Sequence, residues 1–119
     1  MYIERQLLVS GEPNKNGRIF PRYLWDRLIN DIKHDIVIGQ LYHVDSRYHL
    51  LQDTTHLLQN PIVDDEKIYT DIKFLDVPKG IAAYKIIEEI GIENFKLDLS
   101  WSEVDASLSF ITANLIPNK

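Results

Sequence analysis

The sequence contains no cysteine, which excludes disulfide bridges, thiolate-ligated zinc and a cysteine nucleophile. It also lacks long hydrophobic runs, and no stretch approaches the roughly 20 apolar residues of a transmembrane helix. Glu4 and Arg5 stand where a secretion signal needs apolar residues, so we expect neither a signal peptide nor membrane insertion. Any covalent catalysis must use serine, threonine, lysine or a carboxylate.

Positive charge is in the minority, with 13 lysine and arginine residues against 18 aspartate and glutamate residues. The net charge of −5 argues against nucleic-acid binding, because affinity for a phosphate backbone depends on cationic side chains. Glycine and proline are few, five each, and occur singly, so no linker or low-complexity segment is indicated. The 119 residues have ordinary globular composition, and residues 1–119 are predicted to form one domain.

The spacing of apolar residues predicts the order strand, helix, three strands, helix, two strands. Gly39, inside the second strand, indicates a bulge or a close approach of two backbones. The expected strands cover residues 2–9, 35–43, 54–63, 67–75, 95–101 and 107–115, and the expected helices cover 21–34 and 78–90. Two helices are too few for a doubly wound parallel sheet. We therefore expect an α+β fold, a small antiparallel β-barrel or strongly twisted sheet with two flanking helices.

Three local features refine this prediction. Pro61 places the third strand at a sheet edge or a strand end, because proline donates no ladder hydrogen bond. The acidic run 64–66 is expected to be the turn of a hairpin rather than an acid/base pair. The second helix is expected to bury Ile81, Tyr84, Ile87 and Ile90 and to end at Gly91.

Metal and nucleotide sites are not indicated. His43, His49 and His56 could be considered as ligands, but their spacings of six and seven residues match no familiar metal motif. Gly11 and Gly17 enclose a loop of turn-forming residues that lacks the Lys-Ser/Thr ending of a phosphate-binding loop. We expect no metal and no cofactor.

Ser100 is the candidate nucleophile. It stands between Leu99 and Trp101 in a predicted strand, where, taken alone, it is interpreted as an ordinary hydroxyl at the edge of the core. A catalytic serine needs a base to take its proton, usually a histidine within hydrogen-bond reach. His43 and His56 are the candidates, and spacing alone selects neither.

A larger pattern begins with NKNGRIFP at 14–21, directly before a predicted helix. It continues with GQLYH at 39–43, TH at 55–56, IYTDIKFLDVPKG at 68–80 and IIEEIG at 86–91. In this order the segments resemble those of tailed-phage prohead core proteases, which are capsid-maturation serine proteases distantly similar to herpesvirus assemblins. The resemblance implies a small β-barrel flanked by helices. It also implies peptide hydrolysis through an acyl-enzyme, with His43 as base and then acid and Ser100 as nucleophile.

The chain departs from this family around the implied nucleophile. Trp101, Ser102 and Glu103 follow Ser100 where the family has serine, arginine and glycine. Thr112 or Ala113 stands where the family has an aspartate, which leaves His56 or Asp98 as candidates for the third catalytic group. Loss of the orienting acid has cost a serine protease about four powers of ten in rate. These departures favour a degenerate site.

We therefore expect a phage head or virion assembly protein that keeps the protease fold without its catalysis. The alternative is an active serine endopeptidase that cleaves scaffold and capsid proteins during prohead maturation. Both interpretations imply capsid, scaffold or other virion proteins as partners, allow a homo-oligomer, and place the chain in a phage particle or in a prohead assembled in the host cytoplasm. The structural interpretation also predicts an aromatic contact surface, with Tyr23, Trp25, Tyr48 and Trp101 as its candidates.

Overall fold

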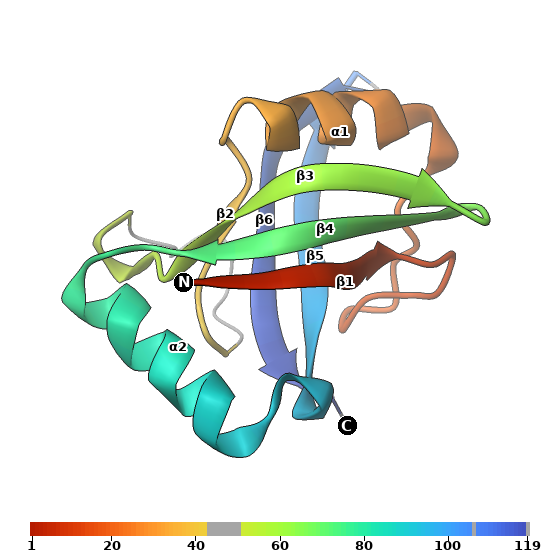
Figure 1. The fold of residues 1–119 in the computed structure, drawn as a ribbon. Coiled ribbons are helices and arrows are strands. Elements are labelled where there is room, and N and C mark those ends of the chain that lie inside the picture. Colours follow the sequence, from red (N-terminus) through yellow and green to blue (C-terminus); the bar gives the residue numbers. More distant parts are fainter. Residues whose placement is uncertain (43–50, 106, 119) are drawn as a thin grey trace.

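The protein, described here by a computed structural model over residues 1–42, 51–105 and 107–118, is one mixed β-sheet with two α-helices (Figure 1). Its elements are β1 (Tyr2–Val9), α1 (Trp25–Lys33), β2 (Ile38–Gly39), β3 (His56–Asp64), β4 (Lys67–Phe74), α2 (Pro78–Ile90), β5 (Phe95–Val104) and β6 (Ser107–Pro117). Single turns of 3-10 helix cover Arg22–Leu24, Leu51–Asp53 and Ile92–Asn94. The predicted order of helices and strands is confirmed.

The sheet has the strand order β1-β4-β3-β2-β6-β5, with β1 and β5 at its two ends. Neighbouring strands are antiparallel except β2 and β6, which run parallel, and Leu41 adds an isolated parallel bridge to Leu115. Within the described residues no ladder joins β1 to β5, so the sheet is not closed. Of the two predicted forms, a barrel or a strongly twisted sheet, the barrel is therefore wrong, and the sheet is mixed rather than wholly antiparallel. The α+β class with two helices is confirmed.

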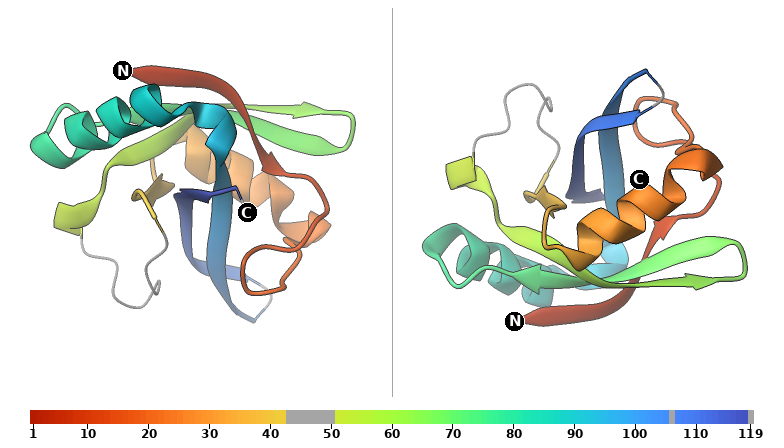
Figure 2. Two further views of the ribbon diagram at one scale, coloured as in Figure 1. Left: turned by 90° about the horizontal axis from the view of Figure 1, so that it is seen from below. Right: turned by 90° about the horizontal axis from the view of Figure 1, so that it is seen from above.

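The sheet nevertheless folds over on itself. In Figure 1, β1, β3 and β4 run across the direction of β5 and β6, and Figure 2 shows the same two layers from above and below. The hydrophobic core lies between these two halves and under the helices, because α1 packs against β3 and α2 against β4. Its fully buried members include Leu28, Ile32, Leu58, Ile72, Ile87 and Leu115. Among the described residues neither helix is long and apolar enough to cross a membrane.

The β3–β4 hairpin follows the predicted pattern. Residues 68, 70, 72 and 74 of β4 are buried and alternate with half-buried ones. Asp65 and Glu66 form the turn, and both have positive φ angles, as the tightest hairpin turns require. Pro61 lies beyond the two β3 residues that pair with β2, within a register shift, so it occupies an edge as predicted.

Two elements differ from their predicted form. The segment predicted as a strand over 35–43 contributes only Ile38 and Gly39 to the ladder, because β2 is a short link between β3 and β6. In α2 the buried residues are Gly80, Ala83 and Ile87, and Ile90 is exposed, so the predicted apolar face was wrong at that position. The helix ends at Gly91 as predicted, and the Gly91 N–H donates to the Ile87 carbonyl.

Candidate functional site

Ser100 lies near the middle of β5, directly opposite Thr112 on β6. Side chains alternate between the two faces of a strand, so Ser100 shares its face with Asp98, and Thr112 shares it with Asn114. We call Asp98, Ser100, Thr112 and Asn114 the polar row. All four are buried, with Ser100 6% exposed and Thr112 1% exposed.

Two members of the polar row are held by backbone donors from elsewhere in the chain. Asn114 Oδ1 accepts the Gln40 N–H at 3.1 Å, and Asp98 Oδ1 accepts the Lys15 N–H at 2.8 Å. The hydroxyls of Ser100 and Thr112 have no hydrogen-bond partner among the described residues. A buried polar group left without a partner costs about 1–3 kcal/mol, so these two hydroxyls call for an explanation.

His56, a predicted candidate for base or third catalytic group, instead joins β3 to β6. Its Nε2 donates to the Ala113 carbonyl at 2.8 Å, and its Nδ1 lies 2.8 Å from the Thr55 hydroxyl. In the neutral ring, Nδ1 accepts the hydrogen of that hydroxyl. The ring is fully buried and both nitrogens have structural partners, so His56 acts as a link within the sheet.

Gly39 makes this link possible. A Cβ atom at position 39 would lie 1.7 Å from the Ala113 oxygen and 2.7 Å from His56 Nε2. The close backbone approach predicted for Gly39 is therefore confirmed. Beyond Gly39 the chain follows β6 as far as Tyr42, whose N–H donates to the Leu115 carbonyl.

Residues 14–18, which we call the strap, cover the outer edge of β5 beside Ser100. Asn14 Nδ2 donates to the Leu99 carbonyl at 2.7 Å, and Arg18 Nη1 donates to the Trp101 carbonyl at 2.8 Å. Asn14 also organises the strap itself, because its Oδ1 accepts the N–H groups of Asn16 and Arg18. The two carbonyls that flank Ser100 on the free side of β5 are therefore already occupied.

Aromatic and charged groups fix the strap's far end. The Arg18 guanidinium lies over the Trp101 ring, 4.2 Å from its centroid, and Phe20 meets the same ring edge-on. The Tyr23 hydroxyl donates to Glu103 Oε1 at 2.7 Å. This hydrogen bond is the main reason that the pKa of Tyr23 is raised, since it favours the protonated phenol, and the negative charge of Glu103 acts in the same direction.

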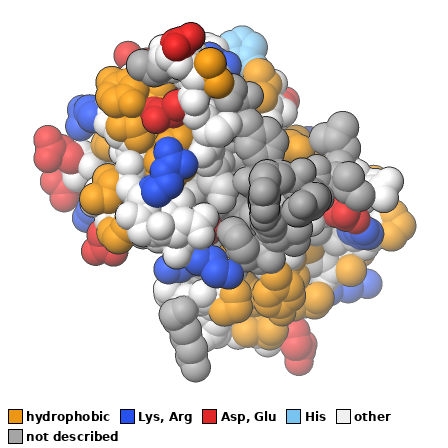
Figure 3. Space-filling view, turned by 180° about the vertical axis from the view of Figure 1, so that it is seen from behind, with side chains coloured by type: hydrophobic (Ala, Val, Ile, Leu, Met, Phe, Trp, Pro, Cys, Tyr) orange, Lys and Arg blue, Asp and Glu red, His pale blue; other side chains and the backbone are white. Residues whose placement is uncertain are grey.

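A cleft of about 340 Å³ between β1 and β5 is lined by Asp98, Leu99 and Trp101, but not by Ser100. Trp101 and Trp25 are buried in the core, so the expected contact surface does not include them, whereas Tyr23 is exposed. On the face shown in Figure 3, the described hydrophobic side chains form separate groups among charged ones.

His43, His49 and Tyr48 lie outside the described residues, so the structure neither joins His43 to Ser100 nor separates them. Asp98, the other candidate for the third group, lies on the same face as Ser100 and bonds to the strap. No cluster of three metal-ligating side chains occurs in the described part of the chain.

Sequence reasoning missed two residues of this site, Asn114 and Asn14. Asn114 stands between Ala113 and Leu115, and an amide within an apolar strand is a signal of a buried polar contact. Asn14 looked like an ordinary turn residue, because its main partner, Leu99, lies 85 positions away.

Comparison with known protein families, with curated proteins and with solved structures finds no match for this chain.

Proposed function

We propose that this chain is a non-catalytic assembly or structural protein of a tailed-phage head, built on a prohead-protease-like fold. The observation that carries the proposal is the closed environment of Ser100. The residue is only 6% exposed, and the strap occupies the carbonyls of Leu99 and Trp101 on either side of it. A protease substrate must bring its scissile carbonyl to the serine oxygen, and this arrangement opposes that approach.

The sequence resemblance supplies the biological setting of the proposal. Five segments of the sequence resemble those of prohead core proteases, and one of them begins at Gly39 of β2. On this basis the partners are capsid, scaffold or other virion proteins, or a second copy of the chain, and the location is the prohead or phage particle.

The departures at the site support the non-catalytic form. Thr112, one of the two residues that stand at the family's aspartate, faces Ser100 across the ladder. Its hydroxyl stays neutral near pH 7 and cannot stabilise an imidazolium as a carboxylate does. The other candidate groups have structural partners, since His56 links β3 to β6 and Asp98 accepts a bond from the strap.

One observation favours the second candidate, an active serine endopeptidase. The Ser100 hydroxyl is buried without a hydrogen-bond partner among the described residues, and such unsatisfied groups are frequent at functional sites. A substrate or a movement of the strap would then have to open the site. In that case Ser100 is the nucleophile and His43 the base.

Cleavage and incorporation assays test the proposal. The protein, its Ser100→Ala variant and the control variant Ser102→Ala, at an exposed position of the same strand, are each incubated with the scaffold and capsid proteins of the same phage. We expect no cleavage by any of the three and co-sedimentation of each with proheads in a fixed ratio. Cleavage by the protein and by Ser102→Ala but not by Ser100→Ala would establish the endopeptidase. Absence from both proheads and mature particles would overturn the structural role.

A further inference from the structure

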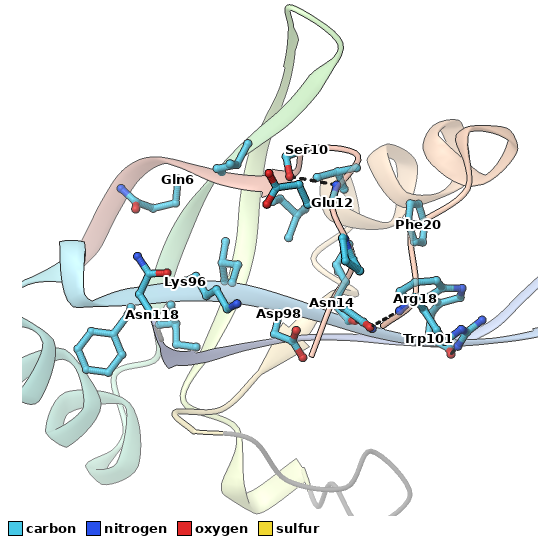
Figure 4. A pocket seen from close by; sticks show the side chains of 18 of the residues that line it. Gln6, Ser10, Glu12, Asn14, Arg18, Phe20, Lys96, Asp98, Trp101 and Asn118 are labelled. Atoms are coloured by element: carbon cyan, nitrogen blue, oxygen red, sulfur yellow. Dashed lines mark hydrogen bonds between the residues drawn. The ribbon is translucent and has the colours of Figure 1, made fainter. Parts of the chain in front are cut away.

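The cleft between β1 and β5 has strand edges for walls. Residues 6–10 of β1 and its following loop form one side, and residues 95–99 of β5 form the other. Figure 4 shows Gln6, Lys96 and Asn118 toward one end of this cleft and Phe20, Arg18 and Trp101 at the other. Because β1 and β5 are the two ends of the sheet, each strand pairs on one side only.

The direction of the β5 backbone groups follows from the strap. The carbonyls of Leu99 and Trp101 point away from β6, because they accept from Asn14 and Arg18. Backbone direction alternates along an antiparallel strand, so Leu97 also presents its N–H and its carbonyl on this outer side. Within the described residues, no backbone hydrogen bond reaches Leu97 from that side.

An adjacent donor and acceptor on a strand edge match the backbone of an extended peptide. One peptide residue opposite Leu97 would form two hydrogen bonds, one with the Leu97 N–H and one with its carbonyl. The next outward-facing backbone groups of β5, on either side of Leu97, would form one further hydrogen bond each with the peptide. The strap covers the edge from Leu99 onward, so the docked stretch is limited to about three residues. Its inward-facing side chain would meet the apolar lining at Leu8, Val9 and Phe20.

The cleft also carries charge of both signs. Lys96 lies on the β5 wall and Glu12 on the opposite wall, and neither has an ion pair with a described residue. A peptide with an acidic residue beside Lys96 and a basic residue beside Glu12 would complement both.

We propose that the β1–β5 cleft binds a short extended peptide segment of a partner protein, which adds to the free edge of β5 at Leu97. This inference depends neither on a phage origin nor on the activity of Ser100.

A peptide library tests the inference without knowledge of the partner. A display library of random nine-residue peptides is selected on the intact protein, and the enriched peptides are synthesised and their binding is titrated by amide NMR. At saturation we expect hydrogen exchange at the Leu97 amide to slow by at least about tenfold. The Asp98 amide, which points toward β6, serves as the internal reference and should change little.

Two tryptophan substitutions separate the cleft from other surfaces. Gln6→Trp fills the cleft from β1 and should weaken peptide binding at least about tenfold, whereas Lys67→Trp, on β4 outside the cleft, should leave it unchanged. If Gln6→Trp does not fold, Glu12→Trp fills the cleft from the loop instead. Failure of any peptide to enrich would overturn the proposal. Binding that leaves Leu97 exchange unchanged, or that survives the cleft-filling variants, would also overturn it.

Discussion

His56 on β3 and Ala113 on β6 are joined by a hydrogen bond of 2.8 Å that passes β2 at Gly39. At this point β2 consists of only two residues, and residues 40–42 continue its contact with β6 through backbone hydrogen bonds to Leu115. The His56 ring therefore supplements a ladder that is very short where the sheet changes from antiparallel to parallel pairing. The link depends on the His56 ring, on the Ala113 carbonyl and on Gly39, which has no side chain to come between them.

Gly39→Ala should be strongly destabilising. The added methyl group would overlap the Ala113 carbonyl, which is backbone and cannot rotate away, so β2 and β6 would have to separate. We expect a loss of at least about 2 kcal/mol in the free energy of unfolding, measured by urea denaturation. Gly11→Ala is the control, because the space around Gly11 is open and only its positive φ opposes the change, at about 1 kcal/mol. Equal losses in the two variants would contradict the close-approach argument.

His56→Leu should also destabilise the protein, although leucine fits a core well. The substitution leaves the Ala113 carbonyl and the Thr55 hydroxyl without this partner, at a cost of about 1–3 kcal/mol. The exposed His34 provides the comparison, and His34→Leu should change stability by about 0.5 kcal/mol or less. Denaturant midpoints of the two variants measure the difference. An unchanged midpoint for His56→Leu would mean that the ring is not a structural link.

The fold was predictable where its signals are local. The alternation in β4 and the turn of its hairpin are contained in a few adjacent residues, and both were predicted. The turn was predicted over 64–66, whereas Asp64 still pairs with Lys67. The sequence indicates that the backbone at Gly39 closely approaches another segment. It does not identify that segment, because Ala113 lies far along the chain. Closure of the sheet depends on whether β1 meets β5, a pairing between the two ends of the sequence that periodicity does not report.

The site was predictable to the same extent. The sequence places Ser100 in a strand, and the structure confirms this. The strap was invisible as a functional element, because its turn residues are explained equally well by an exposed loop. Only the packed chain shows that the side chain of Asn14 reaches the β5 edge.

Asn14→Ala should loosen the strap and expose the β5 edge. The substitution removes the donor to the Leu99 carbonyl and the acceptor for two strap N–H groups. We expect a loss of about 1–3 kcal/mol in unfolding free energy, with faster hydrogen exchange at the Arg18 amide, which donates to Asn14 Oδ1. Asn16→Ala is the matched control, since Asn16 contributes its backbone N–H, which the variant keeps. If the two variants exchange alike, Asn14 is not the residue that holds the strap.

Glu103→Gln should lower the pKa of Tyr23. The carboxylate accepts the phenol hydrogen and repels a phenolate, and both effects raise the pKa in the native state. A raised native pKa contributes stability below the unfolded tyrosine value of about 10, and this contribution is lost as the pH rises through the native pKa. Alkaline titration of the tyrosine ring carbons by NMR measures the change, with Tyr23→Phe to assign the signal. Identical titration in the protein and in Glu103→Gln would show that the hydrogen bond is absent in solution.

Thr112→Val should leave stability unchanged or raise it by about 1 kcal/mol, because valine keeps the shape and removes a buried hydroxyl that has no partner among the described residues. The matched control is Thr70→Val, at an equally buried position whose hydroxyl donates to the Gln59 carbonyl at 2.9 Å. That variant should lose about 1 kcal/mol. Thermal and urea unfolding of both variants give the comparison. A large loss on Thr112→Val would mean that its hydroxyl is paired in solution, and the same measurement on Ser100→Ala would then show whether the two hydroxyls act together across the ladder.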